Sequence, residues 1–401
     1  MRSALACAGA VLALVAEWPA HAYRFNESVE VYGYTQIWLT LWEQMEDDEG
    51  LVQYPSKDEA ADALSGLSIN KARVGLRLAY LDWHLSLHTQ VKIDHDFNLL
   101  DLDVGWAPRR WFSLHLGQLK IPNTFEALTE DQRLDFILRS DITTALADWS
   151  LSKSQHPASL LYGSASNLRD LGLAAKGELK AWGWTGRYFL MVGNGLGANM
   201  YFGGLTRKEY WITNKSQFLY GGRLEVAAYD IATLGAFGSY NEHDNIVFNS
   251  GRAVYDLSRR SVGGDLRVTI PKTGARLYGL GGEGQIRDDF NSDGHIDLRY
   301  SAWAAAAIWD LVPLVAWLTD SQLPEGHALE LAGRFEHLSF EMDDSGSQVH
   351  RDQVTFGASY VAAERLKVQL NYVLRSTEDP LHPERDTLAN NVLFANFQAS
   401  F

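Results

Sequence analysis

Basic side chains recur at alternate positions in one short segment of the chain, where they could act together on a charged solute. In 69–80, Lys71, Arg73 and Arg77 alternate with apolar residues. If this segment is extended, alternate side chains point the same way, so the three cations share one face. Charges that line a narrow passage select ions through the local electrostatic potential. Three cations on one face cannot all be paired locally without several acids nearby, so we expect some positive field to remain.

Other charged residues fall on the polar face of alternating segments and extend this predicted surface. The basic ones are Lys92, Arg187, Arg223, Arg267, Arg299, Arg334 and Lys367. The acidic ones are Asp94, Asp101, Asp103, Glu225, Asp265, Glu330 and Glu336. The alternative is that opposite charges on neighbouring strands pair with each other across the sheet.

A second group of oxygen-bearing residues has the spacing of the first half of a calcium loop. The candidate ligands are Asp289, Asn291, Asp293 and Asp297. Gly294 takes the sixth position, as in such loops, but Tyr300 stands at the twelfth, where they carry a bidentate acid. A hairpin tip has the same composition because turns favour Asn, Asp and Gly. A calcium site and a plain turn both remain as hypotheses.

The chain offers little for catalysis. Asp94, His95 and Asp96 are adjacent at a strand end, but a catalytic triad needs three groups in mutual contact, which adjacency does not supply. Solvated surface is the simpler interpretation of these residues. The single cysteine, Cys7, lies in the N-terminal segment, so cysteine clusters are excluded elsewhere. We predict no enzyme, and no cofactor apart from the calcium hypothesis.

Strict alternation of apolar and polar residues runs through most of the chain. In 83–94, Trp83, Leu85 and Leu87 share one face with Val91 and Ile93, and polar residues occupy the other. This period of two is typical of strands with one apolar and one solvated face. Further strands are expected at 28–42, 69–80, 97–106, 111–120, 167–178, 182–193, 217–229, 231–241, 258–270, 274–288, 296–308, 327–341, 349–361, 364–375 and 390–401. The alternation is weakest at 231–241, and 296–320 could hold an extra turn or a longer strand.

The connections between these segments alternate in length. Short ones lie at 80–82, 107–110, 229–230, 271–274 and 362–364, and long polar ones at 43–67, 121–166, 194–216, 242–257 and 376–389. Transmembrane barrels have short turns at one rim, long loops at the other and an even number of strands. A soluble propeller would show a repeat of roughly 40 to 50 residues, which is not seen, and a soluble sandwich needs no such alternation. We predict an all-β, antiparallel transmembrane barrel of about sixteen strands.

The composition and the first residues agree with export to an outer membrane. Residues 1–22 have the pattern of a signal peptide, with Arg2, an apolar stretch to Ala16 and an Ala20-His21-Ala22 cleavage motif, which leaves 23–401 as the barrel. The chain has 13 Trp, 17 Tyr, 17 Phe and 34 Gly but a slightly negative mean hydropathy. That combination is expected when apolar residues cover one face of many strands. The net charge of −15 argues against a nucleic-acid partner.

The C-terminal segment has the phase of a closing strand. In LFANFQASF, Phe401 shares a face with Phe397 and Leu393. The final strand of a barrel pairs with the first and turns its apolar face to lipid. A terminal aromatic residue in this phase resembles the signal read by the outer-membrane assembly machinery; the alternative is a fortuitous terminal Phe. Expected partners are therefore outer-membrane lipid and that machinery.

Several segments resemble the phosphate-selective porin O and P family. They are 68–80, 100–140, 327–340 and 354–376 with the last eleven residues, and the most specific is GQLKIPNTFE at 117–126. The resemblance implies a sixteen-stranded porin, commonly trimeric, whose third extracellular loop folds into the lumen and narrows it. That loop would be 121–166, which adds Arg133 and Arg139 to the pore lining. Its apolar residues Phe125, Leu128, Leu134, Phe136, Ile137 and Leu138 would anchor it to the inner wall.

The sequence departs from the phosphate-selective members in its loop charges. Acids outnumber bases in 43–62 and in 121–166, so phosphate selectivity does not carry over. We expect a water-filled diffusion channel for small hydrophilic solutes or ions, with weak anion preference set by the lumen and with phosphate among the candidates. The alternative is a barrel that sheaths a haem protein in an electron conduit. Because the chain has no Cys-x-x-Cys-His motif, its haem would belong to another chain.

Overall fold

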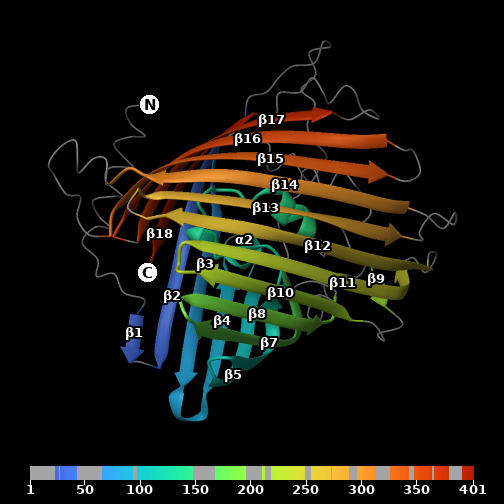
Figure 1. Cartoon of the computed structure of the whole chain (residues 1–401), viewed down its shortest axis with the longest axis horizontal. Helices are drawn as coiled ribbons and strands as arrows, with labels where there is room; N and C mark the ends of the chain where they lie inside the picture. Colours follow the sequence, from blue (N-terminus) through green and yellow to red (C-terminus); the bar gives the residue numbers. More distant parts are fainter. Residues whose placement is uncertain are drawn as a thin grey trace.

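In the computed structural model, one antiparallel sheet closes on itself to form a barrel (Figure 1). The structure describes residues 23–26, 28–42, 66–93, 97–147, 168–195, 210–212, 218–248, 254–271, 273–288, 296–312, 326–342, 347–363, 365–378 and 391–401. The long strands are β2 (Val29–Trp42), β3 (Gly66–Tyr80), β4 (Leu85–Lys92), β5 (Asn98–Arg109), β6 (Phe112–Lys120), β7 (Arg169–Ala181), β8 (Trp184–Gly193), β10 (Leu219–Ala228), β11 (Ala232–Phe248), β12 (Val254–Ile270), β13 (Ala275–Asp288), β14 (Ile296–Asp310), β15 (Ala328–Met342), β16 (Ser347–Ala362), β17 (Leu366–Glu378) and β18 (Val392–Ser400). Two short strands, β1 (Tyr23–Asn26) and β9 (Tyr210–Ile212), lie at the rims.

Each long strand pairs with the next along the chain, and β18 pairs with β2 to close the barrel. The closing register runs from Val392 opposite Trp42 to Ser400 opposite Tyr34. In the described ranges this gives a closed barrel of 16 strands, so the predicted fold is confirmed. No helix in the same ranges is long and apolar enough to cross a membrane.

The two faces of each strand differ as the alternation predicts. In β18, Asn396 and Gln398 are buried toward the lumen, whereas Leu393 and Phe397 lie on the other, partly exposed face. Phe401 follows the outward phase and is 54% exposed. A barrel with an apolar exterior and a polar interior satisfies its backbone within the sheet and its outer side chains in lipid.

Exposed aromatic residues gather at the rim that carries the short turns. They are Tyr80, Trp83, Trp106, Trp111, Trp182, Trp184, Tyr229 and Trp309. Rings of this kind sit at the membrane–water boundary, because their apolar body faces lipid and their polar atom faces water. The aromatic rim and the apolar outer wall place the barrel in a bacterial outer membrane, with this rim toward the periplasm.

Two connections differ from the sequence-based expectation. The predicted loop 242–257 is mostly strand, because β11 continues to Phe248 and β12 begins at Val254, with Val247 opposite Val254. Polar residues fall on both faces of this extension in the sequence, so the apolar–polar alternation fades although the ladder continues. At the other rim, β14 ends at Asp310 and β15 begins at Ala328, so one periplasmic connection is long.

Removal of Phe401 should weaken barrel closure. Its backbone exchanges two hydrogen bonds with Gly33 (2.9 and 3.0 Å), and its ring covers Gly33 so closely that a Cβ there would lie 2.6 Å from the ring. Two such bonds contribute about 1–3 kcal/mol. We expect the deletion to lower the urea midpoint of the refolded barrel in detergent, and Phe401→Tyr to retain it. An unchanged midpoint would show that closure does not depend on Phe401. A smaller amount of assembled barrel in cells, without a change in the midpoint, would indicate recognition of Phe401 by the assembly machinery.

Candidate functional site

The segment after β6 turns into the barrel. Its described part contains α2 (Phe125–Leu128), the 3-10 turn η2 (Asp131–Arg133) and α3 (Asp141–Ala147). Figure 1 shows the helices of this segment inside the barrel, enclosed by the strands. Thr124 caps α2, since the backbone N of Ala127 donates to its hydroxyl (3.1 Å). The inward-folding loop predicted at 121–166 is therefore confirmed over 121–147, and 148–167 lie outside the described residues.

Apolar contacts hold this loop against the wall. Ile137 packs among Trp38, Val373, Val392 and Phe394, with Leu138 beside them. Leu134 and Phe136 are buried, and Phe125 meets Tyr278 edge to face at 5.0 Å. The inner face of β14 carries only Ala302, Ala304 and Ala306 where α3 lies, and these small side chains leave room for the helix. The predicted anchoring by apolar residues is confirmed.

Glu126 ties the two ends of the loop together and to the wall. Its Oε2 accepts hydrogen bonds from the backbone N of Ser140 (2.9 Å), from the Ser140 hydroxyl and from the Thr143 hydroxyl (2.9 Å). Its Oε1 accepts one from the Tyr278 hydroxyl (3.1 Å) and lies 3.6 Å from Nη1 of Arg334. With this many donors a buried carboxylate is held in one orientation and fixes the position of the groups around it.

Asp131 carries the contact between the loop and β3. One oxygen lies 3.1 Å from Nζ of Lys71 and 2.6 Å from Nη2 of Arg73, and the other accepts from Arg139 of the loop itself. Burial alone would raise the pKa of Asp131, but the three cations hold it well below its ordinary value, so the carboxylate stays charged. The loop thus delivers an acid that the strand itself does not have, and Lys71 and Arg73 share it. The expected positive field on this face stays a prediction.

Further charges continue this cluster along β5 to β7. Arg169 forms a two-pronged pair with Asp101 (2.7 and 2.9 Å), and Lys120 donates to the backbone oxygens of Leu128 and Thr129 (2.9 and 3.0 Å). We call Lys71, Arg73, Lys120, Arg139, Arg169, Asp101 and Asp131 the basic belt. Five cations against two acids give it a formal charge of +3. Lys120 and Arg169 were not among the predicted pore-lining residues. Lys120 lies in the most specific family-like segment, 117–126, whereas nothing in the sequence around Arg169 marked it.

Aromatic rings on β2 position the cations of β3. Lys71 lies over the Trp38 ring (5.5 Å), Arg73 over Tyr34 (5.6 Å) and Arg77 over Tyr32 (4.1 Å). The attraction between a cation and a ring face contributes about 0.5–2 kcal/mol each. The three cations are therefore held in a row along the barrel wall.

Three of the other predicted pore-lining cations share one acid. Arg187, Arg223 and Arg267 lie 3.6, 2.7 and 2.7 Å from the carboxylate of Glu225. Arg223 also pairs with Asp265 at 2.7 Å. These charges therefore pair with each other across neighbouring strands, which was the alternative left open by the sequence.

The remaining inward cations divide between the wall and the loop. Arg77 pairs with Glu30 and Glu130, and Arg334 pairs with Glu336. Lys92 is partly buried opposite Arg73, Lys367 donates to the backbone oxygen of Leu134, and Arg133 is 75% exposed. Arg139, as described, belongs to the basic belt.

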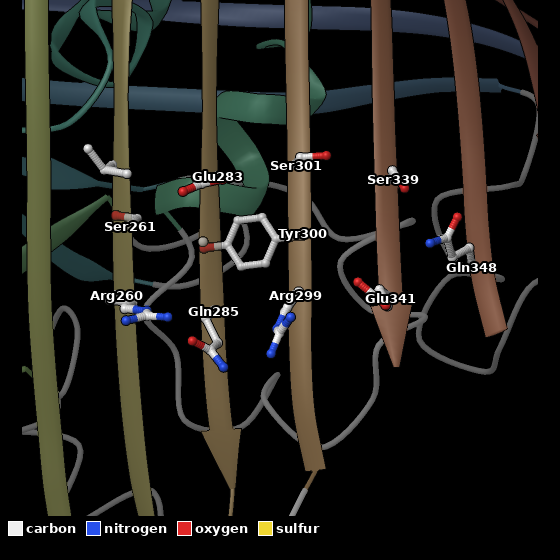
Figure 2. Close-up of a pocket in the computed structure, with 12 residues that line it drawn as sticks. Arg260, Ser261, Glu283, Gln285, Arg299, Tyr300, Ser301, Ser339, Glu341 and Gln348 are labelled. Carbon is white, nitrogen blue, oxygen red and sulfur yellow. The ribbon is translucent and has the colours of Figure 1, made fainter. Parts of the chain in front are cut away.

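Arg299 does not line the lumen. Tyr300, next to it, is buried toward the inside, so Arg299 points outward, beside Arg260 and Gln285 on the neighbouring strands (Figure 2). The prediction for Arg299 is therefore wrong. Above the apolar part of the outer wall, β14 turns Arg299 and Ser301 outward and Tyr300 and Ala302 inward, so a polar residue no longer marks the inner face.

The calcium hypothesis and the acidic strand end fall outside what the structure describes. Asp289, Asn291 and Asp293 are not among the described residues, nor are Asp94, His95 and Asp96. Asp297 is the second residue of β14, but its side chain is not described. Within the described ranges no three acidic, histidine or cysteine side chains form a metal-binding group.

A hydrogen-bonded chain on the inner wall joins three strands. Nδ1 of His115 lies 2.9 Å from Asp103, and its Nε2 lies 3.0 Å from the Ser113 hydroxyl. That hydroxyl donates to the backbone oxygen of Lys176 (3.2 Å). The chain links β5, β6 and β7 beside the basic belt.

Comparison with known proteins supports the fold. No protein-family model and no curated protein matches the chain. Among solved structures, an anion-selective porin from Comamonas acidovorans is 14% identical with a TM-score of 0.57, covering 93% of this chain and 99% of that one. The outer membrane protein OmpT of Vibrio cholerae, in its trimer form, is 13% identical with a TM-score of 0.56 and the same coverage. OmpF of Salmonella typhi is 10% identical with a TM-score of 0.53, covering 93% and 97%. At these identities the similarity concerns the fold, which is that of outer-membrane porins, and membership of the phosphate-selective family stays a prediction.

Replacement of Asp131 by Asn should loosen the loop. The change leaves three closely spaced cations without their shared acid, and breaking a buried ion pair costs roughly 3–5 kcal/mol. We expect a lower urea midpoint in detergent and faster protease cleavage within 121–147. Glu130→Gln is the matched control, because Glu130 is 29% exposed and pairs with Arg77 alone among the wall cations; an exposed pair contributes about 1 kcal/mol or less. Equal effects of the two changes would contradict the central role of Asp131.

Proposed function

We propose that the chain is a porin that lets small hydrophilic solutes diffuse across the outer membrane, with a weak preference for anions. The observation that carries the proposal is the loop 121–147 held inside the barrel against a basic belt of net charge +3. A loop across the lumen limits the size of solutes, and a ring of like charge biases the sign of ions that pass. Phosphate is one anion that such a belt could admit.

The sign of the selectivity depends on where each charge lies. Charges at an open mouth are screened within about 8 Å at physiological salt, whereas those in a narrow lumen are screened much less. The side chains of Asp131, Arg139 and Arg169 are 5, 8 and 9% exposed, so much of the belt is shielded from bulk water. The net charge of −15 for the whole chain therefore does not decide selectivity.

The filled lumen disfavours the electron-conduit alternative. A barrel that sheaths another protein must leave its interior open, but here the loop contacts β3 through Asp131, β15 through Arg334 and β17 through Lys367. Together with the hydrogen bond that Arg223 of β10 donates to the backbone oxygen of Asn123 (3.0 Å), these contacts reach strands around much of the barrel. A diffusion channel needs only a residual path beside the loop.

We also propose a homotrimer. The solved structure of OmpT from Vibrio cholerae is described in a trimer form, and the present barrel has the same architecture. The expected partners in the membrane are copies of the chain, lipid and the assembly machinery.

Neutralising two belt cations should shift the channel toward cations. Lys71→Gln with Arg73→Gln lowers the formal belt charge from +3 to +1. A unit charge about 10 Å from a passing ion contributes on the order of 1 kcal/mol at an effective dielectric constant near 20, so the anion-to-cation permeability ratio should fall at least about threefold. Reversal potentials in planar bilayers under a salt gradient measure this ratio. Arg109→Gln with Arg110→Gln, at a periplasmic turn, removes the same charge and should leave the ratio unchanged.

Two outcomes would contradict the proposal at different levels. A wild-type channel that is strongly cation-selective and does not respond to the belt substitutions would show that acids of the loop, such as Asp135, control permeation. Absence of conductance from correctly folded barrels in planar bilayers would contradict the channel itself.

Removing residues 128–148 should enlarge the pore. The deletion takes out Asp131 and most of the loop that crosses the lumen, while the strands that make the wall remain. We expect a higher single-channel conductance and entry of larger sugars in liposome-swelling assays. Shortening 379–390, the connection between β17 and β18, serves as the control and should change neither. Unchanged conductance in a folded deletion variant would place the constriction elsewhere.

A further inference from the structure

The outer face of β12 to β16 changes from apolar to charged within a few rows of the sheet. The registers place Leu266, Gly279, Ala305, Phe335 and Val354 in one outward row, and Gly264, Gly281, Trp303, His337 and Asp352 in the next toward the loop rim. The following rows are Val262, Glu283, Ser301, Ser339 and His350, then Arg260, Gln285, Arg299, Glu341 and Gln348. The membrane boundary of the outer leaflet therefore crosses these rows.

A cavity of about 720 Å³ lies over the two charged rows. Figure 2 shows Arg260, Gln285 and Arg299 side by side on three adjacent strands, with Glu283, Ser301 and Ser339 in the row nearer the apolar wall. Most of the lining side chains belong to the outward phase of their strands, so the cavity opens outside the barrel. It is separate from the lumen and from the basic belt.

The two arginines in this cavity have no acidic partner in the part of the chain that the structure describes. Every described cation of the basic belt is paired or hydrogen-bonded, but Arg260 and Arg299 are exposed and form no ion pair or hydrogen bond with any residue that the structure describes. An unpaired guanidinium at the edge of an apolar wall is unfavourable unless an anion lies at the same level. Lipid headgroups provide such anions at this depth.

We propose that this cavity binds the phosphorylated headgroup of an outer-leaflet lipid. Arg260 and Arg299 are two strands apart, about 10 Å at the usual strand spacing, so both guanidinium groups can reach one headgroup. Arginine presents planar paired donors that match phosphate oxygens. Below them, Val262, Leu266 and Trp303 are about half exposed and offer an apolar surface that continues into the bilayer for the acyl chains.

The glycines beside Trp303 shape the path between headgroup and chains. Gly264 and Gly281 stand in the Trp303 row, and Gly279 lies one row below, in the outward phase. A Cβ at Gly281 would only make ordinary contact with Trp303 (3.6 Å), so the absence of side chains there leaves a shallow trough. A chain laid in this trough would contact the tryptophan ring on one side.

Glu283 and Glu341 set a condition on the binding. These carboxylates line the same cavity and would repel a bare phosphate. A divalent cation bound between a carboxylate and a phosphate removes this repulsion, since Mg²⁺ commonly joins these two ligands. We therefore expect binding to be stronger in Mg²⁺ than in EDTA.

The test measures lipid binding to the full-length mature barrel in non-ionic detergent by native mass spectrometry. Diphosphorylated lipid A is the probe, and phosphatidylcholine and inorganic pyrophosphate are the comparison ligands. Arg260→Gln with Arg299→Gln should weaken lipid A binding at least about tenfold, because both charge-assisted contacts to the phosphate groups are lost. Arg187→Gln with Arg267→Gln removes the same charge from the lumen and should leave lipid binding unchanged.

The proposal predicts that phosphatidylcholine and pyrophosphate each bind at least about tenfold more weakly than lipid A. Phosphatidylcholine has no net negative charge for the arginines, and pyrophosphate has no acyl chains for the apolar surface. Equal binding of lipid A to the Gln double variant and the wild type would overturn it. Pyrophosphate binding as tight as lipid A would show a free-anion site, and a change in oligomer mass in the double variant would show that a second copy of the chain covers this face; both would overturn it. If the double variant does not fold, the single variants decide, each with an expected loss of about threefold or more. Conductance of the double variant should equal that of wild type, so this result is independent of the channel proposal.

Discussion

The position of the loop inside the barrel depends on one buried carboxylate, Asp131, and on the cations around it. A charge taken out of water is tolerated only when opposite charges and hydrogen bonds surround it. Lys71 and Arg73 of β3 and Arg139 of the loop meet this requirement together. Neither the loop nor the strand could hold its charges in this place alone, so the contact between them stabilises both.

Side chains of the barrel wall form hydrogen bonds with backbone groups of the loop. A segment without regular structure inside a barrel has N–H and C=O groups that must find partners. Lys367 and Gln369 donate to the backbone oxygen of Leu134, Arg334 donates to that of Leu138, and Asn371 accepts from the backbone N of Ile137. Polar residues on the inner face therefore do more than meet water, because many of them hold the loop in one position.

The strands of the barrel face three environments, which are the lumen, the lipid and the membrane surface. Toward the lumen, charges pair across strands or with the loop, as Glu225 does with its three arginines. Toward lipid, the apolar rows of β12 to β16 continue until Trp303. Above that row the outer face becomes polar as well, and Arg260 and Arg299 stand where a lipid headgroup would lie. The same register thus orders the channel, the membrane surface and the proposed lipid site.

The sequence alone determined the strand pattern, because the alternation of side chains between water and lipid is local and repeats every two residues. The long strands, the phase of Phe401 and the identity of the inward loop followed from that pattern and from the family resemblance. The tertiary structure decided which charges neutralise each other. Asp131 is some sixty residues from Lys71 and Arg73, and only the folding of the loop into the lumen brings them together. It also decided the side of Arg299 and the length of β11 and β12, because a polar residue above the membrane boundary is stable on either face and its type no longer reports its direction.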